Sequence, residues 1–245
     1  MTTMLCLYLQ APFAACRTFT AGWYRPTARF LTPSAAYGLI LNLAGIDSRL
    51  SENHPAHASP IPTTLMRPGL PKVRLAIGIP KNDADSPELP RVHTIYQQLH
   101  NYPVGKDAGI PEQLAKGRKN NITPVRREFL SELKALVCID DNPQLEERIR
   151  RGLRGEWNRD RYGLPFLGDN QFLIDRLEEL PCPQEAFWYE RLRGTSDQPP
   201  RPHTTRLTVW IDRADMSKTL SCLYAPTQQA TSQIPEDAWT TIDPP

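Results

Sequence analysis

The sequence predicts an α+β fold of the ferredoxin-like or RRM-like kind. Two capped helical segments, at 33–44 and 143–154, alternate with short apolar segments that are typical of strands. More strand-like segments follow the second helix. The resulting order of strand, helix, strand, strand, helix and further strands is that of a split β-α-β unit. We therefore expect one such domain with an insertion and with extra C-terminal strands.

Both predicted helices have signals at their ends. Thr32 is a suitable N-cap, and Pro33 fits the first helical position. Gly45 fits the left-handed residue that follows a helix end. The second helix has Asn142 as its N-cap and Gly155 behind its last turn, and its leucine and isoleucine residues recur every four positions.

Short apolar runs predict the strands. Residues 4–10 are apolar on both faces, which indicates a buried strand. Residues 73–79 alternate, and one of their faces carries the small residues Ala76 and Gly78, where a backbone or a ligand can come close. The segment 125–139 is ambiguous between strand and helix, and the alternation of Phe129, Leu133, Ala135, Val137 and Ile139 favours a strand.

The remaining segments are long connections with many of the 25 prolines. Residues 47–72 are rich in proline, serine and histidine and predict a loop. A long insertion at about 80–124 contains a strand-like piece at 92–99. Three strand-like pieces follow residue 185, and the final fifteen residues, which are polar, predict a loosely attached tail.

Composition limits the classes of function. The chain has 245 residues and a net charge of only +2, so any nucleic-acid surface must be a local patch. Its five cysteines are scattered without a Cys-x-x-Cys pair, which predicts reduced thiols with neither a zinc site nor a disulfide framework. The N-terminal apolar run is too short for a membrane span. We expect a soluble cytoplasmic protein without metal or other cofactor.

Arginine and aromatic residues mix in the loop before the first helix. They are Arg17, Phe19, Trp23, Tyr24, Arg25, Thr27, Arg29 and Phe30. Such a mixture suits the phosphates and unstacked bases of single-stranded RNA. The alternative is that the aromatic rings pack the loop onto the sheet. The helix start at Thr32 and Ser34 offers backbone N–H groups and a positive dipole end to phosphate or base oxygens.

The insertion is basic, and it is followed by more arginine. The cations and amides are Lys116, Arg118, Lys119, Asn120, Asn121, Arg126 and Arg127. They predict an RNA contact, although a charge run alone is often only a solvated face. Tyr96 and Tyr102 either stack on a base or pack within a hairpin. The arginines of the second helix alternate with glutamates, so they indicate an exposed face or a contact with a partner subunit.

The segment 11–45 resembles the N-terminal signature of the family-five CRISPR-associated proteins. These are RAMP subunits that cap the 5′ end of the crRNA in type I Cascade complexes. The matching elements are Ala11-Pro12, Arg25-Pro26-Thr27-Ala28-Arg29-Phe30, Thr32-Pro33-Ser34 and the helix end from Gly38 to Gly45. The later segments 125–130 and 162–170 also match in character, but Asp169 stands where the family often has a basic residue. The resemblance covers about two thirds of the chain and is strongest over its first fifth.

The resemblance implies how the chain is organised. Residues 1–180 would form an RRM-like RAMP domain, with a β-hairpin thumb inserted at about 80–124. Residues 181–245 would form a β-rich extension with a polar tail. In the family the thumb kinks the RNA, and the palm and first helix hold its 5′ handle.

The resemblance also implies a site and partners. The expected RNA-binding residues are Arg17, Trp23, Arg25, Thr27, Arg29, Thr32, Ser34, Tyr37, Tyr96, Lys116, Arg118, Lys119, Asn120 and Arg126. The expected partners are the crRNA 5′ handle, a backbone RAMP subunit and a large subunit, with target DNA reached through the complex. Whether that complex leads to DNA degradation or recruits transposition proteins is left open.

The sequence favours a binding protein over an enzyme. Family members that cleave precursor crRNA use a tyrosine, a lysine and a histidine, the last two adjacent in sequence. This chain has no Lys-His dipeptide, and its histidines are separate, at positions 54, 57, 93, 100 and 203. The alternatives are a metal-independent crRNA-processing endoribonuclease of the same fold and an RRM-like module unrelated to CRISPR defence.

Overall fold

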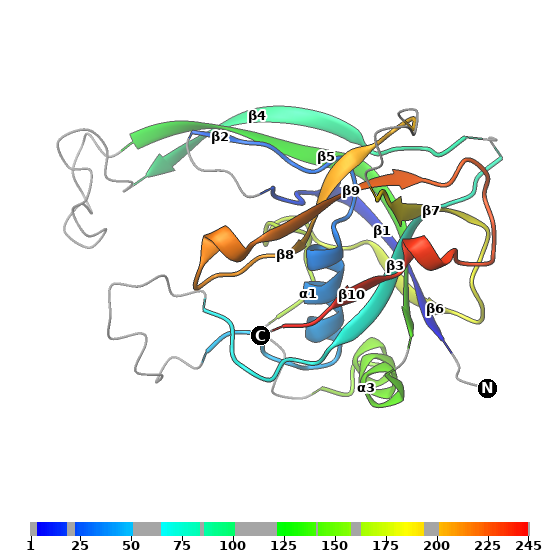
Figure 1. Ribbon diagram of the computed structural model, residues 1–245. Coiled ribbons are helices and arrows are strands. Elements are labelled where there is room, and N and C mark those ends of the chain that lie inside the picture. Colours follow the sequence, from blue (N-terminus) through cyan, green and yellow to red (C-terminus); the bar gives the residue numbers. More distant parts are fainter. Residues whose placement is uncertain are drawn as a thin grey trace.

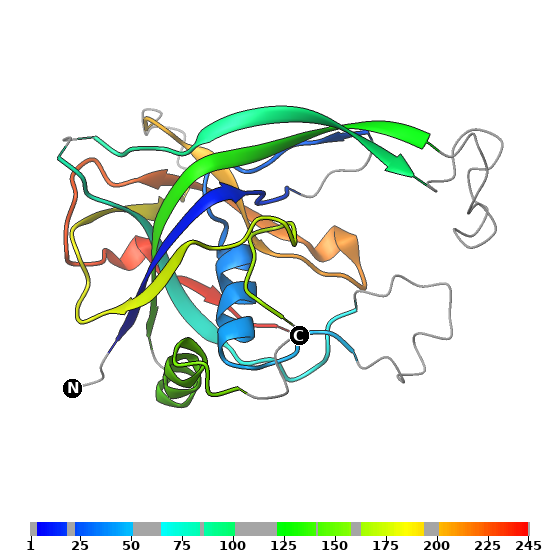
Figure 2. The same ribbon diagram turned by 180° about the vertical axis from the view of Figure 1, so that it is seen from behind.

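One large sheet curves around a central helix in the computed structural model of the chain. Helix α1 (Pro33–Leu43) lies within the curve of the sheet, and helix α3 (Pro143–Leu153) lies beside its lower end (Figures 1 and 2). The structure describes residues 4–18, 23–50, 65–83, 86–100, 122–140, 142–157, 163–193 and 201–244, without the side chains of residues 99, 100, 122 and 123.

Four strands and the two helices form the ferredoxin-like unit. The strands are β1 (Leu5–Ala14), β3 (Val73–Pro80), β5 (Ile122–Asp140) and β6 (Arg176–Leu180). They lie side by side in the order β6-β1-β5-β3, and every neighbouring pair is antiparallel. Helix α1 follows the first of these strands and α3 follows the third, which is the split β-α-β arrangement. The α+β fold class predicted from the sequence is confirmed.

The extra C-terminal strands continue the same sheet. They are β7 (Ala186–Arg191), β8 (Thr205–Trp210), β9 (Leu220–Pro226) and β10 (Thr240–Ile242). Strand β7 pairs with the end of β3, and β9 and β8 follow beyond it. Two short 3₁₀ helices, η3 (Met216–Lys218) and η4 (Glu236–Ala238), flank β9 and β10.

A hairpin projects from the sheet (Figure 1). Strand β4 (Arg91–His100) pairs antiparallel with the first half of β5, and β2 (Tyr24–Arg25) pairs parallel with β5 at Arg126 and Arg127. This hairpin occupies the place of the predicted insertion. Residues 101–121 lie outside the described residues.

Both faces of the sheet are covered, which explains the continuous apolar runs. Leu5, Leu7 and Leu9 of β1 face α1 in the main core. On the opposite face, Cys6 packs with Trp188 under the segment that contains η4. The small residues predicted on one face of β3 lie here, since the indole of Trp188 lies against Gly78 and leaves no room for a Cβ atom. A side chain of the protein, rather than a ligand, occupies that space.

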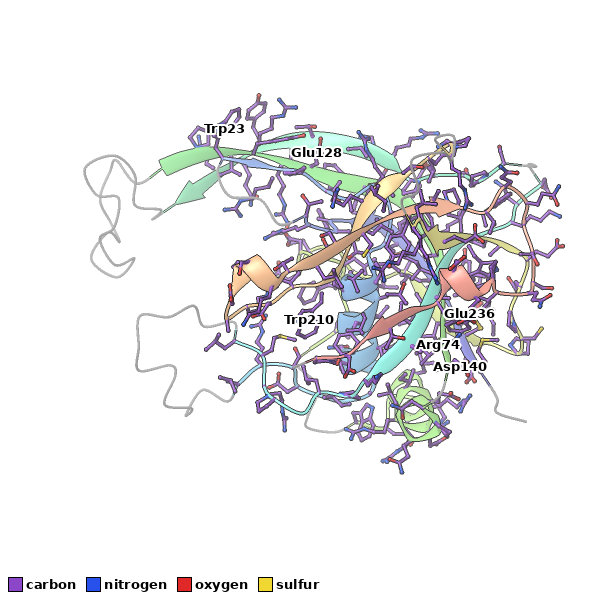
Figure 3. The ribbon with its side chains drawn as sticks, in the orientation of Figure 1. Trp23, Arg74, Glu128, Asp140, Trp210 and Glu236 are labelled. Atoms are coloured by element: carbon purple, nitrogen blue, oxygen red, sulfur yellow. A yellow bond between two sulfur atoms is a disulfide. The ribbon has the colours of Figure 1, made fainter. Side chains whose placement is uncertain are left out.

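The C-terminal segment is firmly attached, so the expectation of a loose tail is wrong. Strand β10 pairs with β3, and Ile242 is buried. The Arg74 guanidinium on β3 donates to Asp140 at 2.7 Å and to Glu236 at 2.8 and 2.9 Å (Figure 3). It also lies 4.5 Å from the centre of the Trp239 ring. Strand pairing and these charged contacts hold the segment, and composition alone does not reveal them.

The cysteines also differ from expectation. Cys6 of β1 stands directly opposite Cys138 of β5, and the structure joins the two buried residues in a disulfide. The prediction that all five thiols are reduced is therefore wrong for this pair. Cysteines at positions 16, 182 and 222 are free. The two bonded residues are 132 positions apart, and only the strand register brings them together.

Two helical glycines predict opposite effects of substitution by alanine. Gly38 in α1 has open space around a Cβ atom, so Gly38→Ala should raise the free energy of unfolding by about 1 kcal/mol. A Cβ atom at Gly152 in α3 would overlap the backbone oxygen of Leu43, so Gly152→Ala should cost about 3 kcal/mol. Urea denaturation of both variants checks this. Equal effects would contradict the close contact between α1 and α3.

Candidate nucleic-acid interface

The start of α1 is built as the sequence predicts. The Thr32 side chain accepts a hydrogen bond from the Ala35 N–H at 3.2 Å, and Pro33 opens the helix. Ser34 lies within 3.1 Å of the Thr32 hydroxyl and is half-buried. Thr32 itself is buried, so its hydroxyl serves the helix start in this structure.

A cleft of about 480 Å³ opens beside this helix. Its walls are α1, the loop 46–49, the segment 164–168 and the chain from Trp210 to Arg213. Figure 3 shows Trp210 beside α1. The predicted site residues that line the cleft are Arg17, Thr32, Ser34 and Tyr37. The lining residues that the sequence did not reveal include Arg49, Phe166, Trp210 and Arg213.

Arginine predominates among the charged residues that line the cleft, where Arg17, Arg49 and Arg213 are accompanied by one aspartate, Asp47, so the cleft carries a net positive charge. Arg17 and Arg213 are exposed as whole residues, but partial desolvation lowers the pKa of both guanidinium groups. The nearby positive charges of Arg127 and Arg25 lower the pKa of Arg17 further, and that of Arg49 does the same for Arg213. Like charges placed this close raise the local positive potential, which attracts phosphate groups.

Tyr37 and Trp210 give the cleft an aromatic wall. The two rings meet edge to face, with their centroids 6.0 Å apart. The Tyr37 hydroxyl donates to the Pro71 carbonyl at 2.8 Å, and burial raises its pKa, so the phenol stays neutral. Tyr37 thus shapes the wall but does not supply a charge.

The hairpin presents a second surface. Trp23 is 61% exposed and Tyr96 is 74% exposed, which suits both for stacking on bases. Tyr96 of β4 stands opposite Arg126 of β5, and the Arg126 guanidinium lies 4.8 Å from the centre of the Tyr24 ring. Figure 3 shows Trp23 on the outer side of this hairpin. Trp23, Tyr24, Tyr96 and Arg126 are called the hairpin surface below.

Glu128 holds the arginine loop against the hairpin, and sequence reasoning missed it. One carboxylate oxygen accepts from the Tyr24 hydroxyl at 2.6 Å, and the other accepts from the Thr27 N–H at 3.1 Å. The Thr27 hydroxyl in turn accepts from the Cys16 N–H at 3.0 Å. Thr27 is buried, so in this structure its polar atoms position the loop.

The other predicted residues fall into three groups. Arg29 is exposed, and Arg25 is half-buried opposite Arg127. Phe30 stacks on Tyr189 with centroids 4.6 Å apart in the core, so packing is the correct alternative for this ring. The predicted contacts Lys116, Arg118, Lys119 and Asn120 lie outside the described residues.

The described residues contain no group of three His, Cys, Asp or Glu side chains that could hold a metal ion. In the same ranges, no helix is long and apolar enough to cross a membrane.

The ring of His93 stacks on Phe129 with centroids 5.3 Å apart, and its Nε2 atom lies 2.8 Å from the Ser131 hydroxyl.

Comparison with known proteins gives a likeness in structure alone. No protein-family model matches the sequence, and no curated protein matches it. The fold is similar to a chain of a "CRISPR RNA-guided surveillance complex", with a TM-score of 0.51 and 13% identity over 93% of this chain and 90% of that chain. A structure titled "Crystal structure of Cas protein" has a TM-score of only 0.43, with 14% identity over 92% of this chain and 94% of that chain. The first likeness shows a common fold.

The bonds of Glu128 predict a graded loss of stability. Tyr24→Phe removes one hydrogen bond to a carboxylate and should lower the free energy of unfolding by about 1 kcal/mol. Glu128→Ala removes both bonds and should cost about 2 kcal/mol. Gln98→Ala, at an exposed position of the same hairpin, should stay within about 0.5 kcal/mol of the parent. Urea denaturation measures the free energy of unfolding of all three variants. Equal losses for Tyr24→Phe and Glu128→Ala would show that the bond from the Thr27 N–H does not contribute to stability.

Proposed function

We propose that this chain is a non-catalytic crRNA-binding subunit of a type I CRISPR Cascade effector. It would cap the 5′ handle of the crRNA and bridge the large subunit and the first backbone RAMP subunit. Three observations support this: the motifs in residues 11–45, the ferredoxin-like fold with its hairpin, and the likeness to a chain of an RNA-guided surveillance complex. Target DNA would be reached through the assembled complex.

The observation that carries the proposal is the electropositive cleft at the start of α1. Arg17 and Arg213 line it from distant parts of the chain, and Ser34 of the first helical turn lines it as well. Phosphates of a single strand bind to such a combination of guanidinium groups and a positive helix end. The affinity would therefore come mainly from the RNA backbone, with little dependence on base sequence.

The hairpin surface would supply the stacking. An exposed indole and an exposed phenol give bases two planar faces without requiring a particular base. Because Arg126 lies between Tyr24 and Tyr96, a phosphate beside a stacked base would meet a guanidinium as well. The cleft and the hairpin surface together suit a bent single strand better than a duplex.

The arginines of α3 contribute little to RNA binding. Arg150 pairs with Glu179 at 2.8 Å, and Arg154 pairs with Glu156 at 2.5 Å. Arg148 donates to the Ala44 carbonyl at 2.9 Å. These contacts leave α3 as a nearly neutral outer surface, which fits a contact with another subunit better than a contact with a polyanion.

Replacing two arginines that line the cleft tests the site. Arg17→Ala with Arg213→Ala should raise the Kd for the 5′-handle RNA about tenfold, since two phosphate contacts are lost. The slope of log K against log salt should become shallower by about 1.4, because each phosphate contact on a single strand contributes about 0.7. Filter binding across a salt series measures both values.

The matched control is Arg191→Ala with Arg206→Ala. These two arginines are exposed on β7 and β8 and do not line the cleft. This variant has the same net charge as the test variant but should keep the parent slope. Unchanged retention of crRNA by a Cascade assembled with the Arg17/Arg213 variant would refute the site assignment.

A cleavage assay separates binding from processing. The purified chain, incubated with repeat RNA in EDTA, should leave the RNA intact, because the sequence lacks the adjacent lysine and histidine of the processing enzymes. Gel electrophoresis of end-labelled RNA reads the result. Cleavage at one fixed position would replace the proposed function by that of an endoribonuclease.

A further inference from the structure

We propose that Asp169 is an internal counter-ion of Arg127, and that an RNA phosphate replaces it there. The pair would then form a further contact point beside the cleft, and its strength would limit the affinity for RNA. This inference rests on the proposed function for the identity of the ligand. The existence of the anion site rests on the geometry of the pair alone.

Arg127 is a buried cation with spare donors. Its side chain is 8% exposed, and its Nη1 atom contacts the Asp169 carboxylate at 2.5 Å. The Nε and Nη2 atoms are buried and have no hydrogen-bond partner in the part of the chain that the structure describes. Unpaired buried donors are costly, whereas an oxyanion that accepts from both removes the cost. Nε and Nη2 form the edge of a guanidinium that binds phosphate in a bidentate manner.

Further positive charge surrounds this pair. Strand register places Arg25 opposite Arg127, and Arg17 stands opposite Thr27 nearby. The charges of Arg127 and Arg25 act on Arg17 in the same direction, and Asp169 opposes them. The Asp169 carboxylate therefore faces the guanidinium groups of Arg127 and Arg17, and Arg25 adds a third positive charge beside them, so a second anion is electrostatically favourable at this point.

The pair also lies beside the cleft. Asp169 is adjacent to Gly168 of the cleft wall, and Arg127 acts electrostatically on Arg17, which lines the cleft. Arg127 follows Arg126 on β5, but successive residues of a strand project to opposite faces, so Arg127 does not belong to the hairpin surface. Burial favours the neutral acid, but the Gln171 N–H and the Arg127 guanidinium outweigh it and lower the pKa of Asp169. The carboxylate is thus ionised at neutral pH and competes with phosphate.

A short turn carries the counter-ion. The Leu167 N–H donates to the Phe172 carbonyl at 3.0 Å, and the Phe172 N–H donates to the Asp169 carbonyl at 2.9 Å. The Phe172 ring lies 5.7 Å from the Arg127 guanidinium and helps to cover it. A small movement of this turn would withdraw the carboxylate and the ring together and expose the free edge of Arg127.

The test compares two neutralised carboxylates in the same segment. Asp169→Asn removes the competing charge but keeps an oxygen for the Gln171 N–H. Asp175→Asn makes the same change of net charge at an exposed position. Fluorescence anisotropy with a labelled single-stranded oligouridylate should show about tenfold tighter binding for Asp169→Asn, one charge-assisted hydrogen bond being worth about that much. Asp175→Asn should stay within about twofold of the parent.

The double variant Asp169→Asn/Arg127→Lys decides whether the gain acts through Arg127. Lysine keeps the charge but not the bidentate edge, so the gain should disappear. No gain with Asp169→Asn, an equal gain with Asp175→Asn, or a gain that survives Arg127→Lys would each overturn the proposal. Thermal unfolding without ligand verifies that each variant is folded.

Pyrophosphate tests the anion site without RNA. It should raise the Tm of the parent chain and raise that of Asp169→Asn further, but it should have little effect on Arg127→Lys. This pattern together with no RNA binding would reject the proposed function and keep the anion site. RNA binding together with an equal response of all three proteins to pyrophosphate would reject the anion site and keep the proposed function.

Discussion

Strand β5 joins the core of the domain to the projecting hairpin, and the other elements take their positions from it. Its C-terminal half pairs with β1 and β3, while its N-terminal half pairs with β4 and β2. Glu132 stands between the halves with a φ of 60°. The ladder with β1 skips this position and Pro12, whose nitrogen has no hydrogen to donate. A positive φ at a residue other than glycine costs about 1 kcal/mol or more, so the surrounding pairing must hold it. The hairpin surface is thereby connected to the core by one continuous strand.

Short-range signals were enough to predict most of the fold. Thr32 and Asn142 cap the helices as expected, and the split β-α-β order is confirmed. The strand predicted over 125–139 differs from the structure at one point. The predicted alternation puts Phe129 on the same face as Leu133, whereas Leu130 enters the core beside Leu133 and Phe129 packs against Phe13 and Phe172. The alternation shifts by one residue at Glu132, which has a positive φ, while the register with β1 stays the same on both sides. Within β5 no glycine marks this position, so the pattern of the strand itself does not predict the shift.

The candidate site could be predicted only where its residues are close in sequence. Arg17 and Ser34 were found because the loop and the helix that carry them are consecutive. Trp210 and Arg213 reach the cleft from the end of β8, and only the order of the C-terminal strands determines that position. Glu128 looks like an ordinary surface charge in the sequence, because its two partners are 101 and 104 residues away.

The distribution of ion pairs reconciles a small net charge with a basic surface. The 29 basic and 27 acidic residues nearly balance. On α3 and beside the C-terminal segment, basic and acidic side chains neutralise each other in ion pairs such as Arg150–Glu179 and Arg74–Asp140. At the cleft, in contrast, Arg17 and Arg213 have other arginines as neighbours. Because charges that are already paired contribute little to the field at a distance, Arg17 and Arg213, which form no ion pair within the described residues, contribute more to the potential that an approaching polyanion meets. A net charge near zero is thus compatible with a surface that binds a polyanion, since most acidic residues neutralise basic residues in other parts of the molecule.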